Sequence, residues 1–162
     1  MVIIEMENGA RIEIELCPDI APITVKNFEK FVSEGFYDGL IFHRVIPGFM
    51  IQGGDPLGNG MGGADEKIVG EFAANGHKND LKHTRGVLSM ARTQNPNSAS
   101  SQFFIMHQNA PYLDRQYAGF GAVIEGIEVV DKIAAVPTGR MGWFDDVPRV
   151  PVVIEKMEVI EE

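Results

Sequence analysis

The sequence predicts a mainly β protein with two α-helices. Three observations carry this prediction: a strictly alternating segment follows an Asn-Gly pair near the N-terminus, short apolar runs separated by glycines fill the middle third, and two segments repeat apolar residues at helical spacing. The chain has 162 residues, which is the length of one domain. A domain of this size can bury roughly 70% of its unfolded surface without disulfides or metals. We therefore expect a single domain over residues 1–162.

The N-terminal part predicts a β-hairpin followed by a helix. Residues 11–16 alternate apolar with charged side chains, and the preceding Asn8-Gly9 pair is the strongest short signal for a hairpin turn. The pattern then changes to helical spacing, in a helix that can hold Pro22 in its first turn and end at Gly35. Its apolar stripe consists of Val25, Phe28, Phe31 and Val32. We expect this helix to cover one open end of a sheet or barrel.

The C-terminal third predicts a second helix and a closing strand. The helix has the apolar stripe Val129, Val130, Ile133 and Ala134. Residues 152–160 are rich in β-branched residues and predict the last strand. Periodicity alone supports a mainly β chain with two helices and does not define how the strands connect.

The composition argues against several classes of function and location. Lys and Arg total 14 and Asp and Glu total 23, so the formal net charge is −9, which argues against a nucleic-acid-binding or anionic-membrane role. Cys17 is the only cysteine, so no intrachain disulfide can form, and we expect it to be a small buried apolar residue. Residues 1–7 lack the basic and apolar parts of a signal peptide, and no apolar run approaches about 18 residues. We expect a soluble, cytoplasmic protein.

Two segments carry the functional information: Phe42 to Asp55, and Ser101 to Ile105. Alternate side chains of a strand share one face, so Arg44 can face a pocket that is also lined by Met50, Gln52 and Phe104. The same parity would place Phe42 on the face of Arg44.

This combination of a guanidinium and an apolar pocket has no acid, base or nucleophile in the motif. The motif therefore favours a reaction that is promoted by hydrogen bonding and desolvation rather than by proton transfer. Rotation about an X-Pro peptide bond fits, because its barrier of about 18 to 20 kcal/mol comes from resonance and no covalent bond to the protein is needed.

At these motifs the chain resembles the cyclophilin family of peptidyl-prolyl cis-trans isomerases over nearly its whole length. The other matching segments are Glu71-Phe72, Leu81 to Thr84, Gly86 to Ala91, Leu113-Asp114 and Phe120 to Val123. The resemblance implies a closed eight-stranded antiparallel β-barrel capped at both ends by α-helices, and a cofactor-free isomerase that acts on proline-containing peptides and folding polypeptides. The compact link at residues 80–86 resembles the small bacterial members. We expect a monomer.

The resemblance also implies roles for individual residues. Arg44 would act on the peptide nitrogen, and Gln52 and Gln102 would bind the substrate backbone or orient the arginine. The proline ring would lie in an apolar pocket formed by Phe49, Met50, Phe104 and Leu113. Ala91 and Arg92 fall where the family pairs its own backbone with an extended peptide.

Three positions depart from the common family pattern. Arg92 replaces an asparagine and could contact acidic residues of a substrate. Tyr117 stands where many members have a histidine, and its hydroxyl should allow catalysis to survive. Tyr112 replaces a tryptophan and lacks its indole N–H, so we expect weakened binding of the cyclic peptide cyclosporin.

Other signals favour no second chemistry. The glycine-rich residues 53–63 lack the Gly-Lys-Ser/Thr ending of a phosphate loop and indicate a tight loop beside the groove. The four histidines show no paired ligand spacing, so we expect no metal site. The serines near His107 lack a nucleophile elbow, and Trp143 has no assigned role. The alternatives that remain open are a non-catalytic module that binds proline peptides and a chaperone-like scaffold.

Overall fold

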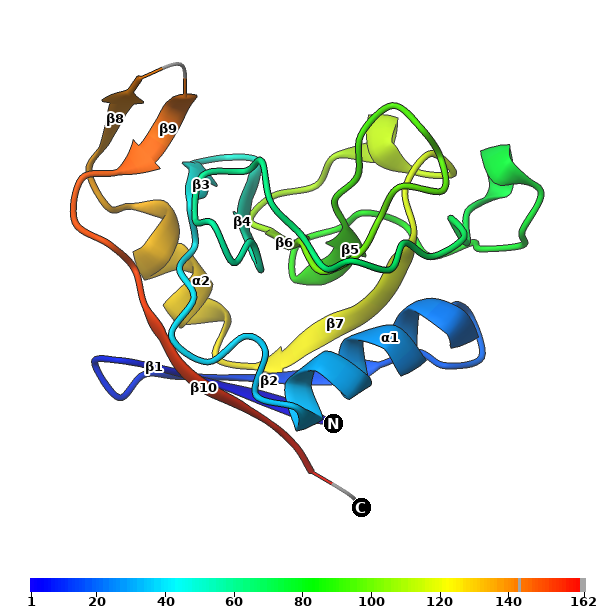
Figure 1. Cartoon of the computed structure of the whole chain (residues 1–162), viewed down its shortest axis with the longest axis horizontal. Coiled ribbons are helices and arrows are strands. Elements are labelled where there is room, and N and C mark those ends of the chain that lie inside the picture. Colours follow the sequence, from blue (N-terminus) through cyan, green and yellow to red (C-terminus); the bar gives the residue numbers. More distant parts are fainter. Residues whose placement is uncertain (143, 161–162) are drawn as a thin grey trace.

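The computed structural model describes residues 1–142 and 144–160 of the chain (Figure 1). Eight strands form one antiparallel sheet and two further strands form a separate hairpin. The strands are β1 (Val2–Met6), β2 (Arg11–Leu16), β3 (Arg44–Ile46), β4 (Met50–Gly53), β5 (Val87–Met90), β6 (Phe103–Met106), β7 (Gly119–Glu125), β8 (Thr138–Met141), β9 (Phe144–Pro148) and β10 (Ile154–Val159). The α-helices are α1 (Pro22–Ser33) and α2 (Ile127–Ala134), and short 3₁₀ helices span Ala73–Asn75 and Pro111–Leu113.

The large sheet is an open half-barrel, so the prediction of a closed barrel is wrong. The strand order is β10-β1-β2-β7-β5-β6-β4-β3, which places β10 and β3 at opposite edges. In the described part of the chain these edges approach through an isolated bridge between Ile41 and Val153 and the backbone hydrogen bonds around it. β3 pairs with β4 and β10 pairs with β1, and no ladder joins β3 to β10 among the described residues. The predicted antiparallel arrangement of eight strands with two helices is confirmed.

The predicted elements form close to their expected positions. β1 and β2 pair as a hairpin, and Gly9 in its turn has a φ of +88°, a conformation that glycine adopts without strain. α1 begins at Pro22 and ends before Gly35, while α2 buries the whole predicted stripe. The closing strand β10 begins at Ile154, two residues later than expected. The hairpin of β8 and β9 has no counterpart among the predicted elements.

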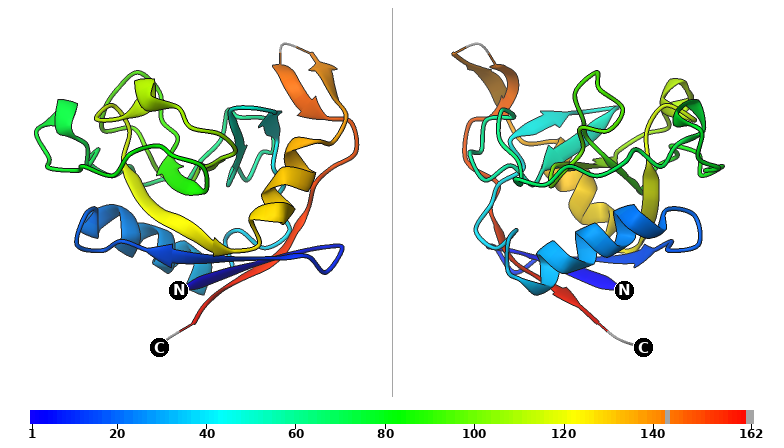
Figure 2. Two further views of the ribbon diagram at one scale, coloured as in Figure 1. Left: turned by 180° about the vertical axis from the view of Figure 1, so that it is seen from behind. Right: turned by 45° about the vertical axis from the view of Figure 1, so that its right-hand side comes forward.

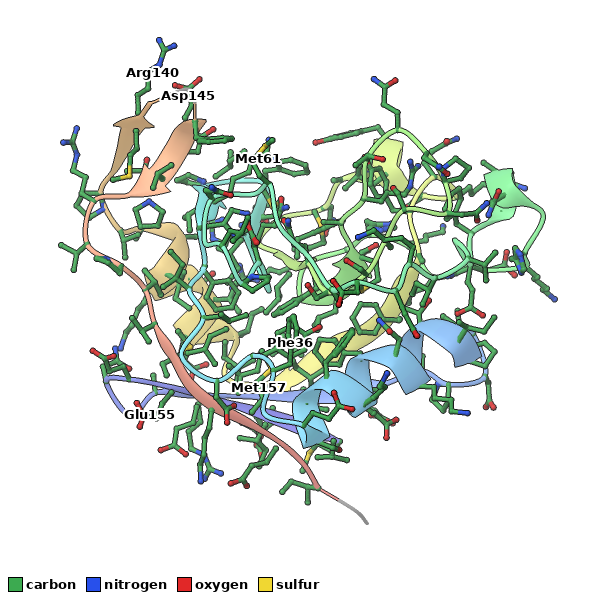
Figure 3. All side chains as sticks on the ribbon, in the orientation of Figure 1. Phe36, Met61, Arg140, Asp145, Glu155 and Met157 are labelled. Carbon is green, nitrogen blue, oxygen red and sulfur yellow. The ribbon has the colours of Figure 1, made fainter. Side chains whose placement is uncertain are left out.

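The helices lie apart on the sheet, and the views in Figure 1 and Figure 2 agree on this. α1 packs along β10, and α2 contacts β2, β3 and β4. In β10, Ile154 and Met157 are buried and Glu155 is exposed, because the pairing with β1 shifts register at Glu155 and interrupts the alternation. Figure 3 labels Glu155 and Met157 on this strand. The β8–β9 hairpin projects beside β3, which β9 contacts.

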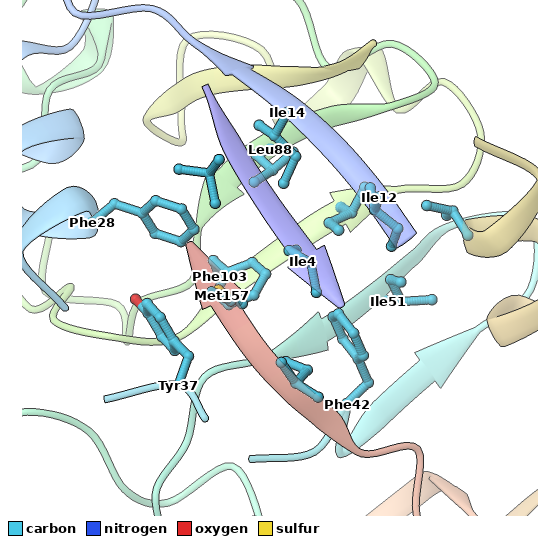
Figure 4. Close-up of a cluster of buried hydrophobic side chains, with 14 of the residues drawn as sticks. Ile4, Ile12, Ile14, Phe28, Tyr37, Phe42, Ile51, Leu88, Phe103 and Met157 are labelled. Carbon is cyan, nitrogen blue, oxygen red and sulfur yellow. The ribbon is translucent and has the colours of Figure 1, made fainter. Parts of the chain in front are cut away.

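The main core lies between the sheet and α1, and its centre is aromatic (Figure 4). Phe28 of α1 is fully buried and its ring lies 5.4 Å from that of Phe103 and 5.3 Å from that of Tyr37. The Tyr37 hydroxyl donates a hydrogen bond of 2.9 Å to the carbonyl of Ser101. This buried bond ties the segment after α1 to the residues that precede β6.

A carboxylate that is distant in the sequence accepts hydrogen bonds from the first turn of α1. Glu71 is buried and accepts hydrogen bonds from the backbone N–H (2.6 Å) and the hydroxyl (2.7 Å) of Thr24, in the first turn. Helix N-termini have unpaired N–H groups and favour negative charge. Glu71 therefore anchors the helix to the long segment between β4 and β5.

Cys17 is half-buried, so the prediction of a buried residue is only partly met. Burial and the neighbouring Glu15 and Asp19 carboxylates raise the pKa of its thiol, which keeps the thiol protonated. No helix in the described ranges is long and apolar enough to span a bilayer. Trp143 lies outside the described residues.

Candidate active site

A small pocket on the face of the sheet opposite the main core gathers most of the predicted site residues. It encloses about 130 Å³. Its lining consists of Arg44, Phe49, Met50, Gln52, Ala91, Arg92, Phe104, Leu113 and Tyr117. Of the predicted residues, Gln102 lies next to this lining and Tyr112 lies outside it. We call this the proline pocket, after the ring that it is predicted to hold.

The register of the sheet explains why the residues meet. Arg44 of β3 lies opposite Gln52 of β4, and Gln52 lies opposite Phe104 of β6. Directly opposed residues share one face, so these side chains form a row across three strands. Phe104 in turn lies opposite Ser89 of β5, which extends the row to a fourth strand.

The neighbouring row faces the core and holds the register in place. It consists of Val45, Ile51, Ile105 and Leu88, all fully buried. Phe42 also lies in the core, with its ring 6.1 Å from that of Phe103, so the expected shared face with Arg44 is wrong. β3 begins only at Arg44, and the alternation of a strand does not extend into the irregular segment before it.

Arg44 is the outermost member of a chain of hydrogen bonds. Its Nη1 donates to Oε1 of Gln52 at 3.3 Å, and Nε2 of Gln52 donates to Oε1 of Gln102 at 2.9 Å. Nε2 of Gln102 donates to the carbonyls of Gly60 (3.1 Å) and Gly62 (2.7 Å). Each amide therefore has a defined orientation, and the guanidinium retains donors that can reach a ligand.

The Asp55 side chain fixes the glycine-rich loop beside the pocket by hydrogen bonds to the loop backbone. The buried carboxylate accepts backbone hydrogen bonds from Leu57 (2.8 Å), Asn59 (3.1 Å) and Gly60 (2.6 Å). Burial alone would raise the pKa of Asp55, but these backbone donors outweigh it and the pKa lies below its usual range. The loop is thus a tight turn fixed by a carboxylate, in agreement with the prediction of a tight loop.

The floor of the proline pocket is Phe104, and a buried histidine supports it. The ring of His83 stacks on Phe104 with centroids 6.2 Å apart. Its Nδ1 lies 3.1 Å from Oδ1 of Asp114 and its Nε2 lies 2.8 Å from the hydroxyl of Ser89. Burial lowers the pKa of His83 in spite of Asp114. From the sequence, His83 has no predicted role in the site, and its place under the pocket was missed. The only signal in the sequence was that His83 and Asp114 both lie in segments that match the family.

Arg92 forms a wall of the proline pocket and its charge is used within the protein. The guanidinium lies between the rings of Phe72 (4.8 Å) and Tyr117 (4.6 Å). It donates to the carbonyls of Thr93 (2.9 Å) and Gln116 (2.6 Å). Nη1 and Nη2 therefore point at the chain's own carbonyls, and Nε of Arg92 is buried without a hydrogen-bond partner among the described residues. The contact with acidic substrate residues stays a prediction.

The backbone at residues 91 and 92 has one residue, Arg92, whose amide and carbonyl can pair with a ligand. The amide of Ala91 donates to the carbonyl of Gln102 at 3.0 Å. Neither the amide nor the carbonyl of Arg92 has a hydrogen-bond partner within the described residues. A main-chain donor and acceptor therefore remain available beside the proline pocket.

The two tyrosines that depart from the family pattern differ in position. Tyr117 lines the pocket with its ring 5.9 Å from that of Phe104. Tyr112 is 69% exposed and its ring lies 6.0 Å from that of Phe49, at the rim. No group of three potential metal ligands occurs in the part of the chain that the structure describes.

Comparisons with known proteins identify the family of this chain. The model of the cyclophilin type peptidyl-prolyl cis-trans isomerase family matches residues 1–159. A peptidyl-prolyl cis-trans isomerase of Acinetobacter baylyi is 49% identical, with 96% of this chain and 84% of the relative covered. Peptidyl-prolyl cis-trans isomerase B of Escherichia coli is 46% identical, with 95% and 96% covered.

A solved structure shares the fold. The crystal structure of a cyclophilin type isomerase from Cryptosporidium parvum, in the presence of the dipeptide Ala-Pro, has a TM-score of 0.88 and 32% identity. The match covers 99% of both chains. Because the family model matches residues 1–159 and these relatives are 46% and 49% identical over nearly the whole chain, this chain belongs to the cyclophilin-type peptidyl-prolyl cis-trans isomerases.

Proposed function

We propose that the chain carries out the peptidyl-prolyl isomerisation of its family at the proline pocket, with Arg44 as the catalytic residue. The observation that carries the proposal is the guanidinium of Arg44 at the mouth of a small apolar pocket, oriented by Gln52. A volume of about 130 Å³ suits one small ring, being well below that of pockets for drug-sized ligands. Met50 and Phe104 supply its apolar surface and are both nearly fully buried.

The chemistry follows from the electronic structure of the peptide bond. Conjugation of the nitrogen lone pair with the carbonyl makes the C–N bond stiff, and the lone pair returns to nitrogen as the bond twists. A donor aimed at that nitrogen stabilises the twisted state more than either planar state. Arg44 stays charged at all relevant pH and presents several donors in a plane, so one can address the nitrogen while another remains on Gln52.

The hydrogen bond from Arg44 supplies only part of the rate enhancement. Uncatalysed isomerisation takes roughly 10 to 100 s, and reaching milliseconds requires about 6 to 7 kcal/mol. A hydrogen bond to a charged group contributes about 1.5 to 3 kcal/mol. The remainder must come from desolvation and from positioning of the proline ring against Phe104 and Met50.

The substrates are extended, proline-containing segments of peptides and folding polypeptides. The free amide and carbonyl of Arg92 can pair with the backbone of such a segment whatever its side chains. The Cryptosporidium structure with Ala-Pro supports a proline-containing ligand for this fold. We further propose that the protein works as a cytoplasmic monomer, and that Tyr112 weakens its binding of cyclosporin.

A protease-free isomerisation assay tests the function. Exchange between the cis and trans forms of an X-Pro peptide is measured by NMR for wild type, Arg44→Ala and the matched control Arg11→Ala, an exposed arginine on β2. We expect wild type and Arg11→Ala to accelerate exchange and Arg44→Ala to lose roughly 10²- to 10³-fold, as when one transition-state donor is removed. If folded wild type gives no acceleration while still binding the peptide, the chain is a binding module and the proposal fails.

A further inference from the structure

A second cavity lies on the other side of Arg44 from the proline pocket. It encloses about 350 Å³. The cavity shares Arg44 and Gln52 with the proline pocket, so a peptide in one can reach the other without a gap. Its remaining lining comes from His43, Asn59, Gly60, Phe144, Asp145, Asp146 and Val147. We call it the acidic subsite.

The floor of the acidic subsite holds a buried histidine with no partner. His43 is 4% exposed, and both of its ring nitrogens are buried without a hydrogen bond within the described residues. A Cβ at Gly60 would lie 3.5 Å from Nε2 of His43, so the loop backbone packs close to that nitrogen and places no side chain against it from Gly60. Burial lowers the pKa of His43, which leaves the ring neutral, with one nitrogen able to accept and the other able to donate. Buried polar groups normally have partners, so this ring indicates a ligand.

The wall of the acidic subsite is a pair of carboxylates on the β8–β9 hairpin. Asp145 and Asp146 line the cavity from the hairpin, and Asn59 and Gly60 line it from the glycine-rich loop. Figure 3 labels Asp145 on the hairpin and Met61 on the loop. A bulge occurs here, because both aspartates lie opposite Arg140. Asp146 has a φ of +62°, which turns this part of β9 away from regular pairing.

Two carboxylates, Asp145 and Asp146, and two guanidiniums, Arg44 and Arg140, lie at or beside the acidic subsite, so their formal charges balance. Nε of Arg140 lies 4.0 Å from Oδ1 of Asp145, and both side chains are mostly exposed, so the pair is weak. Asp146 has no ion pair among the described residues. Arg44 contributes one positive charge on the side of the proline pocket. A ligand here meets two carboxylates and a nitrogen that can accept a hydrogen bond.

We propose that the acidic subsite binds the basic side chain, lysine or arginine, of a residue close to the proline of the substrate. The proposal rests on the isomerase function and extends it to a substrate class. The ammonium or guanidinium would lie between Asp145 and Asp146 and donate to His43. Strand residues advance about 3.3 Å each, so a site that shares Arg44 with the proline pocket serves positions within about three residues of the proline.

Peptides with a single proline test this proposal. Lysine, glutamine or glutamate is placed in turn at each of the three positions on either side. Binding is measured by NMR titration and isomerisation by exchange spectroscopy in the same samples, so the two are separated. The variant Asp145→Asn/Asp146→Asn removes both charges, and asparagine tolerates the positive φ of position 146. The variant Glu125→Gln/Glu128→Gln changes the net charge equally at exposed positions outside the cavity lining.

At one position we expect lysine to bind roughly fivefold more tightly than glutamine, and glutamate more weakly still. The Asp145→Asn/Asp146→Asn variant should lose this preference and the control should keep it. The ring nitrogen signals of His43 should shift with the lysine peptide alone. The proposal is overturned if no position prefers lysine, or if the preference survives without the two aspartates. An active enzyme without the preference refutes only the acidic subsite, whereas an inactive protein that retains the preference refutes only the isomerase function.

Discussion

Among the described residues, Gln52 is the one side chain that links Arg44 to the protein by a hydrogen bond, and its replacement by alanine should slow isomerisation without disturbing the fold. In wild type, Nη1 of Arg44 donates to Oε1 of Gln52, whose Nε2 is held by Gln102. Gln52→Ala leaves Arg44 on the same strand but free to leave the position in which it meets the substrate. Because Gln52 is only half-buried and lies outside the main core, its truncation opens no core cavity.

The size of the effect follows from two contributions. A fully formed hydrogen bond to a charged group contributes about 1.5 to 3 kcal/mol, and the bond to Arg44 is long at 3.3 Å and exposed, so the lower end applies. A freed arginine regains up to about 2 kcal/mol of rotamer entropy that must be lost again in the transition state. Since these contributions overlap, we expect a loss of about 1 to 2 kcal/mol, which is roughly 5- to 30-fold in kcat/KM.

The assay is a double-mutant cycle. The value of kcat/KM is measured by NMR exchange for wild type, Gln52→Ala, Arg44→Ala and the double variant, with urea unfolding as a check of stability. If Gln52 acts by holding Arg44, its removal should cost nothing further once Arg44 is alanine, so the two effects should be strongly non-additive. Equal losses from Gln52→Ala in both backgrounds would refute this reasoning and indicate direct contact with the substrate.

Three further predictions follow from other contacts. Glu71→Ala removes the buried carboxylate that accepts hydrogen bonds from Thr24 in the first turn of α1, and it should lower the free energy of unfolding by about 2 to 3 kcal/mol. Calorimetry should show this as a fall of roughly 4 to 12 °C in Tm, whereas the exposed control Glu66→Ala should change Tm little. Tyr112→Trp should tighten cyclosporin binding at least about fivefold in a titration, because an indole N–H restores a donor at the rim; an unchanged Kd would exclude this residue as the cause. Burial lowers the pKa values of His43 and His83 in the folded protein below their values in the unfolded chain, so the unfolded chain binds more protons. The free energy of unfolding should therefore fall as the pH drops from about 7.5 to 5.5. Urea midpoints that do not move over this range would contradict the assignment.

The elements with strong local signals could be predicted from the sequence. The Asn8-Gly9 turn and the two apolar stripes depend on interactions between near neighbours, so their pattern is readable in a single chain. The prediction that Arg44 and Gln52 share a face succeeded for the same reason, since both lie in one short hairpin. Placing Phe104 with them is a hypothesis that no local pattern supports, because strand pairing across about fifty residues leaves no local signal.

The remaining features depend on long-range geometry. Whether an eight-stranded sheet closes depends on the tilt and stagger of its strands, which the local sequence pattern does not reveal. The guanidinium of Arg92 contacts the rings of Phe72 and Tyr117, which lie far from each other in the sequence, so the sequence does not reveal these contacts. The acidic subsite joins His43 to a hairpin about a hundred residues later, and an acidic pair alone is most simply read as solvated surface.

The register of the half-barrel links its core to its chemistry. Each residue of the buried row in β3, β4 and β6 is adjacent in sequence to one that lines the proline pocket, so a slip of one residue in β3 would bring Arg44 into the core and Val45 to the surface. Burying an unpaired guanidinium costs far more than any contact it could gain there. The cost of the wrong register is therefore greatest at the catalytic residue, and the side chains that position Arg44 most firmly are Val45 and Ile51, which the substrate never touches.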